Sequence, residues 1–209
     1  MALPVYREFR VRRVFAMKSV CVFCGSSPGA NGAYLAAARE LGRTLAEQGA
    51  RVVYGGAAVG LMGAVADAAL EAGGEAVGVI PEFLFKKEIA HQGLTELVTV
   101  ASMHERKAKM ADLSDGFIAL PGGMGTLEEF CEVVTWAQLG LHQKPCGLLN
   151  AAGYYAPLME FFNRMTGERF IKEVHKGIVL CEDGPGELLA AMRAFTPVIA
   201  PKWLDRDKT

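Results

Sequence analysis

Short apolar segments of four to six residues alternate along the chain with longer segments in which apolar residues recur every three or four positions. The short segments predict buried strands, and the long ones predict amphipathic helices. The predicted strands cover residues 19–24, 51–54, 75–80, 97–101, 117–120, 145–150 and 178–181. The predicted helices cover residues 32–48, 61–71, 104–113, the stretch from the glycine turn at 121–125 to about 139, 155–166 and 185–193.

This order of elements predicts an α/β fold with a doubly wound, Rossmann-like parallel sheet of about seven strands and helices on both faces. We expect a single domain over residues 18–195, preceded by a loose leader at 1–17 and followed by a tail at 196–209. The leader carries four arginines but no apolar stretch of the kind found in secretory signals, so we do not expect it to direct secretion.

Glycine-rich turns follow three of the predicted strands, at residues 25–29, 55–60 and 121–125. In open parallel sheets, ligands bind beyond the carboxyl ends of the strands. The three turns therefore predict a ligand site at that edge of the sheet.

The third turn and the residues after it, Pro-Gly-Gly-Met-Gly-Thr-Leu-Glu-Glu at 121–129, are the most informative segment. A strand, a glycine turn and a helix N-terminus make an anion site, because exposed backbone N–H groups and the helix dipole favour negative charge. Glu128 and Glu129 would lie close to that anion, which indicates chemistry on a phosphorylated molecule. An alternative is a capping box, with Thr126 as N-cap and Glu129 three residues later.

Arg106 and Lys107 fall near the start of another predicted helix, where cations are unfavourable. A bound anion would explain them, because Arg and Lys both bind phosphate. The alternative is a solvated helix face with intrahelical Glu–Lys pairs. Glu88 alone is only a charged loop residue.

Three familiar motifs are incomplete. Gly-Ser-Ser-Pro-Gly at 25–29 matches a hydrolase elbow, but Pro28 lacks the N–H that an oxyanion hole needs. The turn at 55–60 has P-loop glycine spacing without the following Lys and Ser or Thr, so it indicates phosphate or sugar contact or merely tight packing. Glu128 replaces the third glycine of a dinucleotide fingerprint, which argues against an NAD-dependent oxidoreductase.

The net charge of −1 gives no electrostatic case for nucleic-acid binding, and no apolar run approaches a membrane span. The five scattered cysteines indicate buried thiols in a reducing cytoplasm, with Cys21 and Cys24 on opposite faces of a strand. The four histidines lack metal-ligand spacing. The apolar helices at 130–139 and 155–165 favour a homodimer.

The sequence resembles the "Lonely Guy" family of cytokinin-activating phosphoribohydrolases, long mislabelled as lysine decarboxylases. Residues 121–129 match the family's PGGxGTxxE, and residues 103–107 match its MHxRK. Residues 24–27 and 54–63 match the first two turns, except that Ala57 stands where a third consecutive glycine is common. The resemblance runs from about residue 18 to about residue 189.

The resemblance implies hydrolysis of the N-glycosidic bond of nucleoside 5′-monophosphates to free base and ribose 5-phosphate. The favoured substrates would be N6-prenylated adenosine monophosphates, with AMP often accepted. It implies no metal or organic cofactor and a commonly dimeric protein. Arg106 and Glu129 would be the catalytic pair. The residues implied in substrate binding are Glu88, Arg106, Lys107, Gly122, Gly123, Met124, Gly125, Thr126, Leu127, Glu128, Glu129 and Thr135.

In this interpretation an ionised Glu129 stabilises the ribosyl cation and orients water, and cationic neighbours and helix N–H groups keep it ionised. The alternative from another class is a carrier or sensor of the same fold that binds a nucleotide or a nucleotide-bearing cofactor without cleaving it. Such a protein would keep the glycine turns but would not need Arg106 and Glu129 as a pair.

Overall fold

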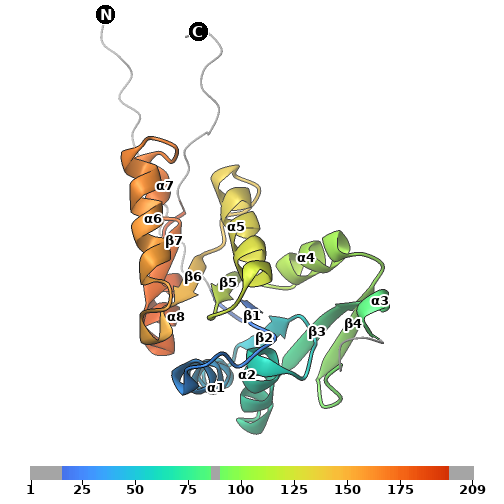
Figure 1. Cartoon of the computed structure of the whole chain (residues 1–209). Helices are drawn as coiled ribbons and strands as arrows, with labels where there is room; N and C mark the ends of the chain where they lie inside the picture. The colour runs from blue at the N-terminus through green and yellow to red at the C-terminus, as the bar shows by residue number, and fades with distance from the viewer. Residues whose placement is uncertain (1–15, 86–89, 198–209) are drawn as a thin grey trace, which may run out of the picture.

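The computed structural model describes residues 16–85 and 90–197. Its centre is one parallel sheet of seven strands in the order β4-β3-β2-β1-β5-β6-β7 (Figure 1). The strands are β1 (Ser19–Phe23), β2 (Arg51–Tyr54), β3 (Ala76–Pro81), β4 (Glu96–Val100), β5 (Gly116–Ala119), β6 (Cys146–Leu149) and β7 (Val179–Glu182). The chain winds outward from β1 in one direction and returns to build outward from β5 in the other. The doubly wound sheet predicted from the sequence is therefore confirmed.

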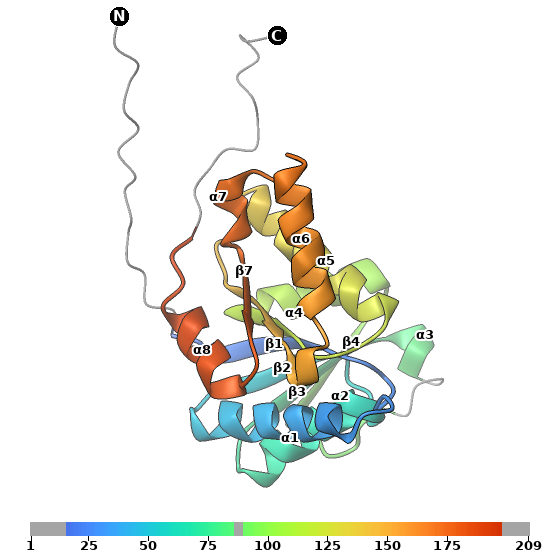
Figure 2. The ribbon, with the colours of Figure 1, turned by 60° about the vertical axis from the view of Figure 1, so that its left-hand side comes forward.

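Helices cover both faces of the sheet (Figure 2). One layer contains α1 (Gly32–Glu47), α2 (Gly60–Glu71) and α8 (Pro185–Arg193). The other contains α4 (Met103–Asp112), α5 (Met124–Gln138) and α6 (Ala156–Gly167). Three short helices that the sequence analysis did not predict are α3 (Glu82–Phe85), η1 (Ala151–Gly153) and α7 (Glu173–Lys176).

Alternating side chains of each strand feed two separate cores. Val20 and Val22 of β1 join the core beneath α1, α2 and α8, whereas Cys21 and Phe23 join the core beneath α4, α5 and α6. Cys24, just past the strand, belongs to the first core, so the predicted opposite placement of Cys21 and Cys24 is confirmed. All five cysteines are free thiols. None of the helices in the described ranges combines the length and apolar character that a bilayer crossing requires.

Small residues bring α1 and α2 into close contact. Gly42 of α1 faces the main chain of α2, and a Cβ there would overlap the carbonyl oxygen of Val65. Ala38 and Ala69 are fully buried in the same layer. The first glycine turn leads into α1 and the second leads into α2, so this contact fixes the two turns relative to each other.

We predict that Gly42→Ala lowers the free energy of unfolding by about 1–3 kcal/mol, the usual range for overpacking against a rigid neighbour. Chemical denaturation monitored by circular dichroism measures this change. Gly32→Ala is the matched control, because the space around the corresponding Cβ is open. An unchanged denaturation midpoint in Gly42→Ala would show that α1 and α2 can move apart without loss of stability.

Candidate active site

The three glycine turns are bonded to one another at the carboxyl edge of the sheet. The N–H of Leu61 donates to the Gly25 carbonyl at 3.1 Å, and the N–H of Gly25 donates to the Pro121 carbonyl at 3.1 Å. Gly60 has a φ of +59°, and a Cβ there would overlap the main chain of Ser26. The three turns thus meet at the edge of the sheet where the sequence predicts a ligand site, and part of the glycine content is explained by backbone packing.

A cavity of about 260 Å³ opens between the first and third turns. It is lined by residues 25–29 and 121–123, together with Tyr34, Leu61 and Tyr154. Its position between β1 and β5 is the switch point of the sheet, where α/β proteins of this type bind their ligands.

The capping-box interpretation of Thr126 and Glu129 is wrong. Helix α5 begins at Met124, its N-cap is Gly123, and no side chain caps it. Thr126 lies inside the first turn, is buried, and packs so closely on Gly122 that a Cβ at that glycine would overlap its hydroxyl. Thr126 therefore holds the turn together, and the first N–H groups of α5 receive no bond from a capping side chain.

Gly123 and Gly125 differ from Gly122 in their surroundings. Gly123 has a φ of −92°, which other residues adopt, and a Cβ at either Gly123 or Gly125 would meet nothing within 4 Å. Both residues are exposed, and Met124 between them is 85% exposed. Since the fold does not require glycine at 123 or 125, close approach of a ligand to the backbone is the physical reason that remains.

Arg106 is buried although it carries a charge. It is only 7% exposed, and its guanidinium lies over Gly55, where a Cβ would overlap it. Its Nε has no hydrogen-bond partner among residues 16–85 and 90–197, and its Nη1 donates a long hydrogen bond to the Met103 sulfur at 3.8 Å. A buried guanidinium N–H without an acceptor is costly, so a ligand that supplied an acceptor would be favoured at this position.

Glu129 lies within the electrostatic reach of Arg106. Burial raises the pKa of Glu129, and Arg106 is the strongest influence in the opposite direction. Burial also raises the pKa of the Cys24 thiol, which Glu129 raises further and Arg106 lowers. Both charges therefore lie near Cys24, the residue before the first glycine turn. As expected, the cationic neighbours Arg106 and Lys107 favour the ionised carboxylate, but desolvation outweighs them and leaves the pKa of Glu129 above its ordinary value.

Lys107 connects two helices instead of facing an open anion site. Its Nζ lies 2.7 Å from Glu128 Oε1 and 3.0 Å from Glu132 Oε2. These carboxylates on α5 raise the pKa of Lys107, and its side chain is 11% exposed. The alternative of intrahelical Glu–Lys pairs is thus wrong for Lys107, which pairs with the neighbouring helix.

The other predicted site residues take different positions. Leu127 is partly buried against the core beneath α5, and the hydroxyl of Thr135 donates to the Cys131 carbonyl of its own helix. Glu88 lies outside the described residues. Arg106 and Glu129 do not line the 260 Å³ cavity, whereas Gly122 and Gly123 do.

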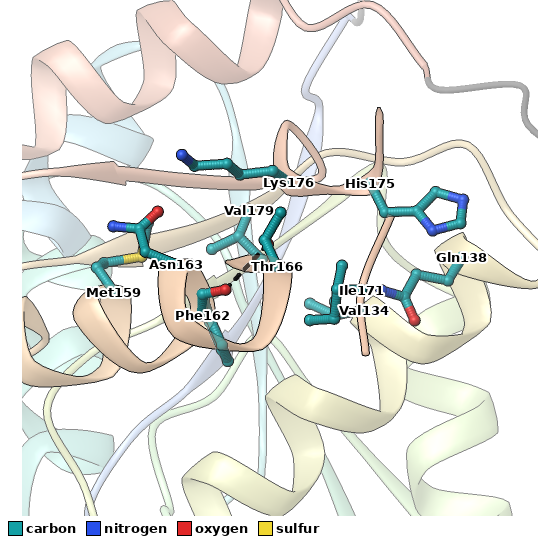
Figure 3. A pocket seen from close by; sticks show the side chains of 10 residues that line it. All are labelled: Val134, Gln138, Met159, Phe162, Asn163, Thr166, Ile171, His175, Lys176 and Val179. Atoms are coloured by element: carbon teal, nitrogen blue, oxygen red, sulfur yellow. Dashed lines mark hydrogen bonds between the residues drawn. The ribbon is translucent and has the colours of Figure 1, made fainter. Parts of the chain in front are cut away.

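A second cavity lies far from the glycine turns, between α5, α6 and α7 (Figure 3). Its volume of about 40 Å³ has room for two or three water molecules and none for a nucleotide. His175 contributes to its lining and is buried. Across the described ranges, no group of three or more His, Cys, Asp or Glu side chains could hold a metal ion.

Comparison with known proteins gives the family. A family profile described as "Possible lysine decarboxylase" matches residues 62–192. A cytokinin riboside 5′-monophosphate phosphoribohydrolase of Rhodococcoides fascians is 53% identical over 83% of this chain and 88% of its own length. This chain belongs to the cytokinin riboside 5′-monophosphate phosphoribohydrolase family. Another member, from Arabidopsis thaliana, is 49% identical over 87% of this chain and 79% of its own length.

Among solved structures, the molybdenum cofactor carrier protein of Chlamydomonas reinhardtii is 22% identical, with a TM-score of 0.63. The match covers 84% of this chain and 95% of the carrier. At this identity the likeness shows the fold alone. The phosphoribohydrolase family thus shares its parallel sheet with carrier proteins.

We predict that Glu129→Gln stabilises the protein at neutral pH. The folded state raises the pKa of Glu129 above its unfolded value. Between those two values the folded state holds a proton that the unfolded state has released, so stability falls as the pH rises through that window. Glutamine removes this loss. Scanning calorimetry should show a higher melting temperature for the variant at pH 7.

The advantage of Glu129→Gln should vanish below about pH 4.3, the ordinary pKa of Glu, where both side chains are neutral. Glu47→Gln, a matched change at the exposed end of α1, should show no such difference. A variant less stable than wild type at pH 7 would contradict the burial of Glu129.

Proposed function

We propose that the protein is a hydrolase that cleaves the N-glycosidic bond of adenosine 5′-monophosphates, including N6-modified ones, to free base and ribose 5-phosphate. The observation that carries the proposal is the pair Arg106 and Glu129. A protein that only binds a nucleotide could use the buried guanidinium to hold the phosphate, but it would have no use for a desolvated carboxyl group within the electrostatic reach of that guanidinium. The sequence relatives, which are named as phosphoribohydrolases, support the same function.

The substrate phosphate would bind the uncapped start of α5, at the rim of the 260 Å³ cavity. The exposed backbone of Gly123 and Gly125 allows the phosphate to approach the N–H groups and the positive end of the helix dipole. Arg106 would supply a further cation and donate hydrogen bonds to the substrate. The ammonium of Lys107 is already paired with Glu128. We therefore propose that Lys107 affects the substrate indirectly, by holding the Glu128 side chain in place.

Glu129 would act one turn further along α5, beside the anomeric carbon. Cleavage passes through a ribosyl cation, which a nearby carboxylate stabilises. Its raised pKa makes Glu129 a stronger base toward the attacking water than an ordinary carboxylate. The bound phosphate would hold the sugar next to Glu129, so a substrate without its phosphate would be poorly placed for cleavage. No metal or organic cofactor enters this scheme.

Incubation with AMP and with isopentenyl-AMP, followed by chromatography, tests the proposal. We expect both free base and ribose 5-phosphate to accumulate in equal amounts. Glu129→Gln should lower kcat by about 10²–10⁴-fold, the usual contribution of a positioned base. Glu47→Gln is the control and should match the wild-type rate.

Two outcomes would contradict the hydrolase. If the wild type binds AMP without releasing adenine, the carrier alternative holds. If Glu129→Gln cleaves AMP at the wild-type rate, the carboxylate has no catalytic role and the assignment of the pair fails.

We also propose a homodimer that buries α6. No residue of α6 is buried in the single chain, and Phe161 on this helix is 53% exposed. Phe170 and Val174, which follow α6, are 85% and 45% exposed. A monomer seldom leaves so many large apolar side chains close together in water.

Light scattering coupled to size-exclusion chromatography tests the dimer. Phe161→Glu should shift the mass from two chains toward one. Phe83→Glu is the matched control, because Phe83 is 54% exposed on α3, at the opposite end of the sheet (Figure 1). A monomeric wild type, or a dimer that survives Phe161→Glu unchanged, would contradict an interface on α6.

We further propose a cytoplasmic location, supported by five cysteines that all remain free thiols. Residues 18–195 would form the catalytic domain.

A further inference from the structure

Two adjacent tyrosines bind the carbonyl groups on either side of Pro121. The hydroxyl of Tyr154 donates to the Gly122 carbonyl at 2.6 Å, and the hydroxyl of Tyr155 donates to the Leu120 carbonyl at 2.6 Å. The Pro121 carbonyl between them accepts from the Gly25 N–H at 3.1 Å. Three consecutive carbonyl groups before α5 are therefore held by donors from other parts of the chain.

Holding a carbonyl group also sets the direction of the next N–H. A trans peptide is planar, and its C=O and N–H point in opposite directions. The bond from Tyr154 to the Gly122 oxygen therefore aims the N–H of Gly123, the N-cap of α5. This peptide joins two glycines, which have few steric barriers to rotation. The hydrogen bond from the Tyr154 hydroxyl to the Gly122 oxygen opposes such a flip.

We infer that Tyr154 is a positioning residue that keeps the Gly123 N–H turned toward the phosphate of the substrate. The inference rests on the proposed function, in which the start of α5 binds that phosphate. If the peptide flipped, the Gly122 oxygen would face the anion in place of an N–H, and attraction would become repulsion.

The surroundings of Tyr154 hold its ring in place. It packs edge-on against Tyr34, with ring centroids 5.4 Å apart, and against Tyr155, at 5.1 Å. Ala152 and Gly153 before it have φ values of 51° and 73°, a left-handed pair that turns the chain sharply after β6. Asn150 accepts from the Tyr155 N–H at 2.8 Å and donates to Asp183 at 2.8 Å, which anchors the tyrosine pair to the sheet end.

Tyr154 and Tyr155 differ in exposure, so their substitution should have different effects: one on peptide direction and the other on the stability of the fold. Tyr155 is 1% exposed, so its removal leaves a buried carbonyl group without a donor and should lower the melting temperature. Tyr154 is 39% exposed, so water can replace its hydroxyl bond. Tyr154→Phe should therefore keep the fold and lose only the control of peptide direction.

Calorimetric titration with ribose 5-phosphate and with adenine tests the inference. We expect Tyr154→Phe to bind ribose 5-phosphate about three- to tenfold more weakly, the usual worth of one neutral hydrogen bond. Adenine binding should not change, and the KM for AMP should rise while kcat stays within about twofold. Thr44→Ala, which removes a hydroxyl that donates within α1, should change none of these quantities.

Nuclear magnetic resonance gives a readout independent of activity. The ¹⁵N–¹H resonance of Gly123 should move in Tyr154→Phe and stay in Thr44→Ala. An unmoved Gly123 resonance together with an unchanged dissociation constant for ribose 5-phosphate overturns the inference, even if the wild type cleaves AMP. The opposite outcome is a wild type that binds ribose 5-phosphate but does not cleave AMP, and a Tyr154→Phe variant that binds ribose 5-phosphate more weakly. That outcome would contradict the hydrolase and support the inference.

Discussion

Direct contact between three backbone turns at the centre of the sheet is the constraint on which the site depends. The first turn donates to the third through Gly25 and accepts from the start of α2 through Leu61. Side chains at Gly60 or Gly122 would push the turns apart. Because β1 lies beside both β2 and β5, only its own turn can join the other two. The order of the strands and the glycines in the turns are therefore both needed for the three turns to touch.

Around this backbone centre the protein places charges in conditions that oppose folding. Arg106 is buried without an acceptor for its Nε, and Glu129 is desolvated enough for its pKa to rise. Neither arrangement stabilises the chain alone. In the proposed function, both would become favourable once a phosphorylated sugar supplied an acceptor to Arg106 and a developing cation to Glu129. The free energy of folding that the protein loses at these two residues can be recovered when the substrate binds and when the transition state forms.

The sequence predicted the sheet and its ligand edge because apolar runs and glycine turns are local signals. It failed where the outcome depends on contacts between distant segments. The start of α5 depends on Thr126 packing against Gly122, and the partners of Lys107 come from a helix 21 residues further on. The rise in the pKa of Glu129 requires knowledge of its burial. Tyr154 reaches Gly122 across 32 residues, which no motif in the sequence indicates.

The high pKa of the thiols has a consequence for their reactivity. Desolvation raises the pKa of every cysteine, including the buried Cys24 near Arg106 and Glu129 and the exposed Cys131 of α5. Peroxides and alkylating agents react with thiolates, which are scarce when the pKa is high. The Cys24 thiol, next to the first glycine turn, should therefore resist oxidation and alkylation.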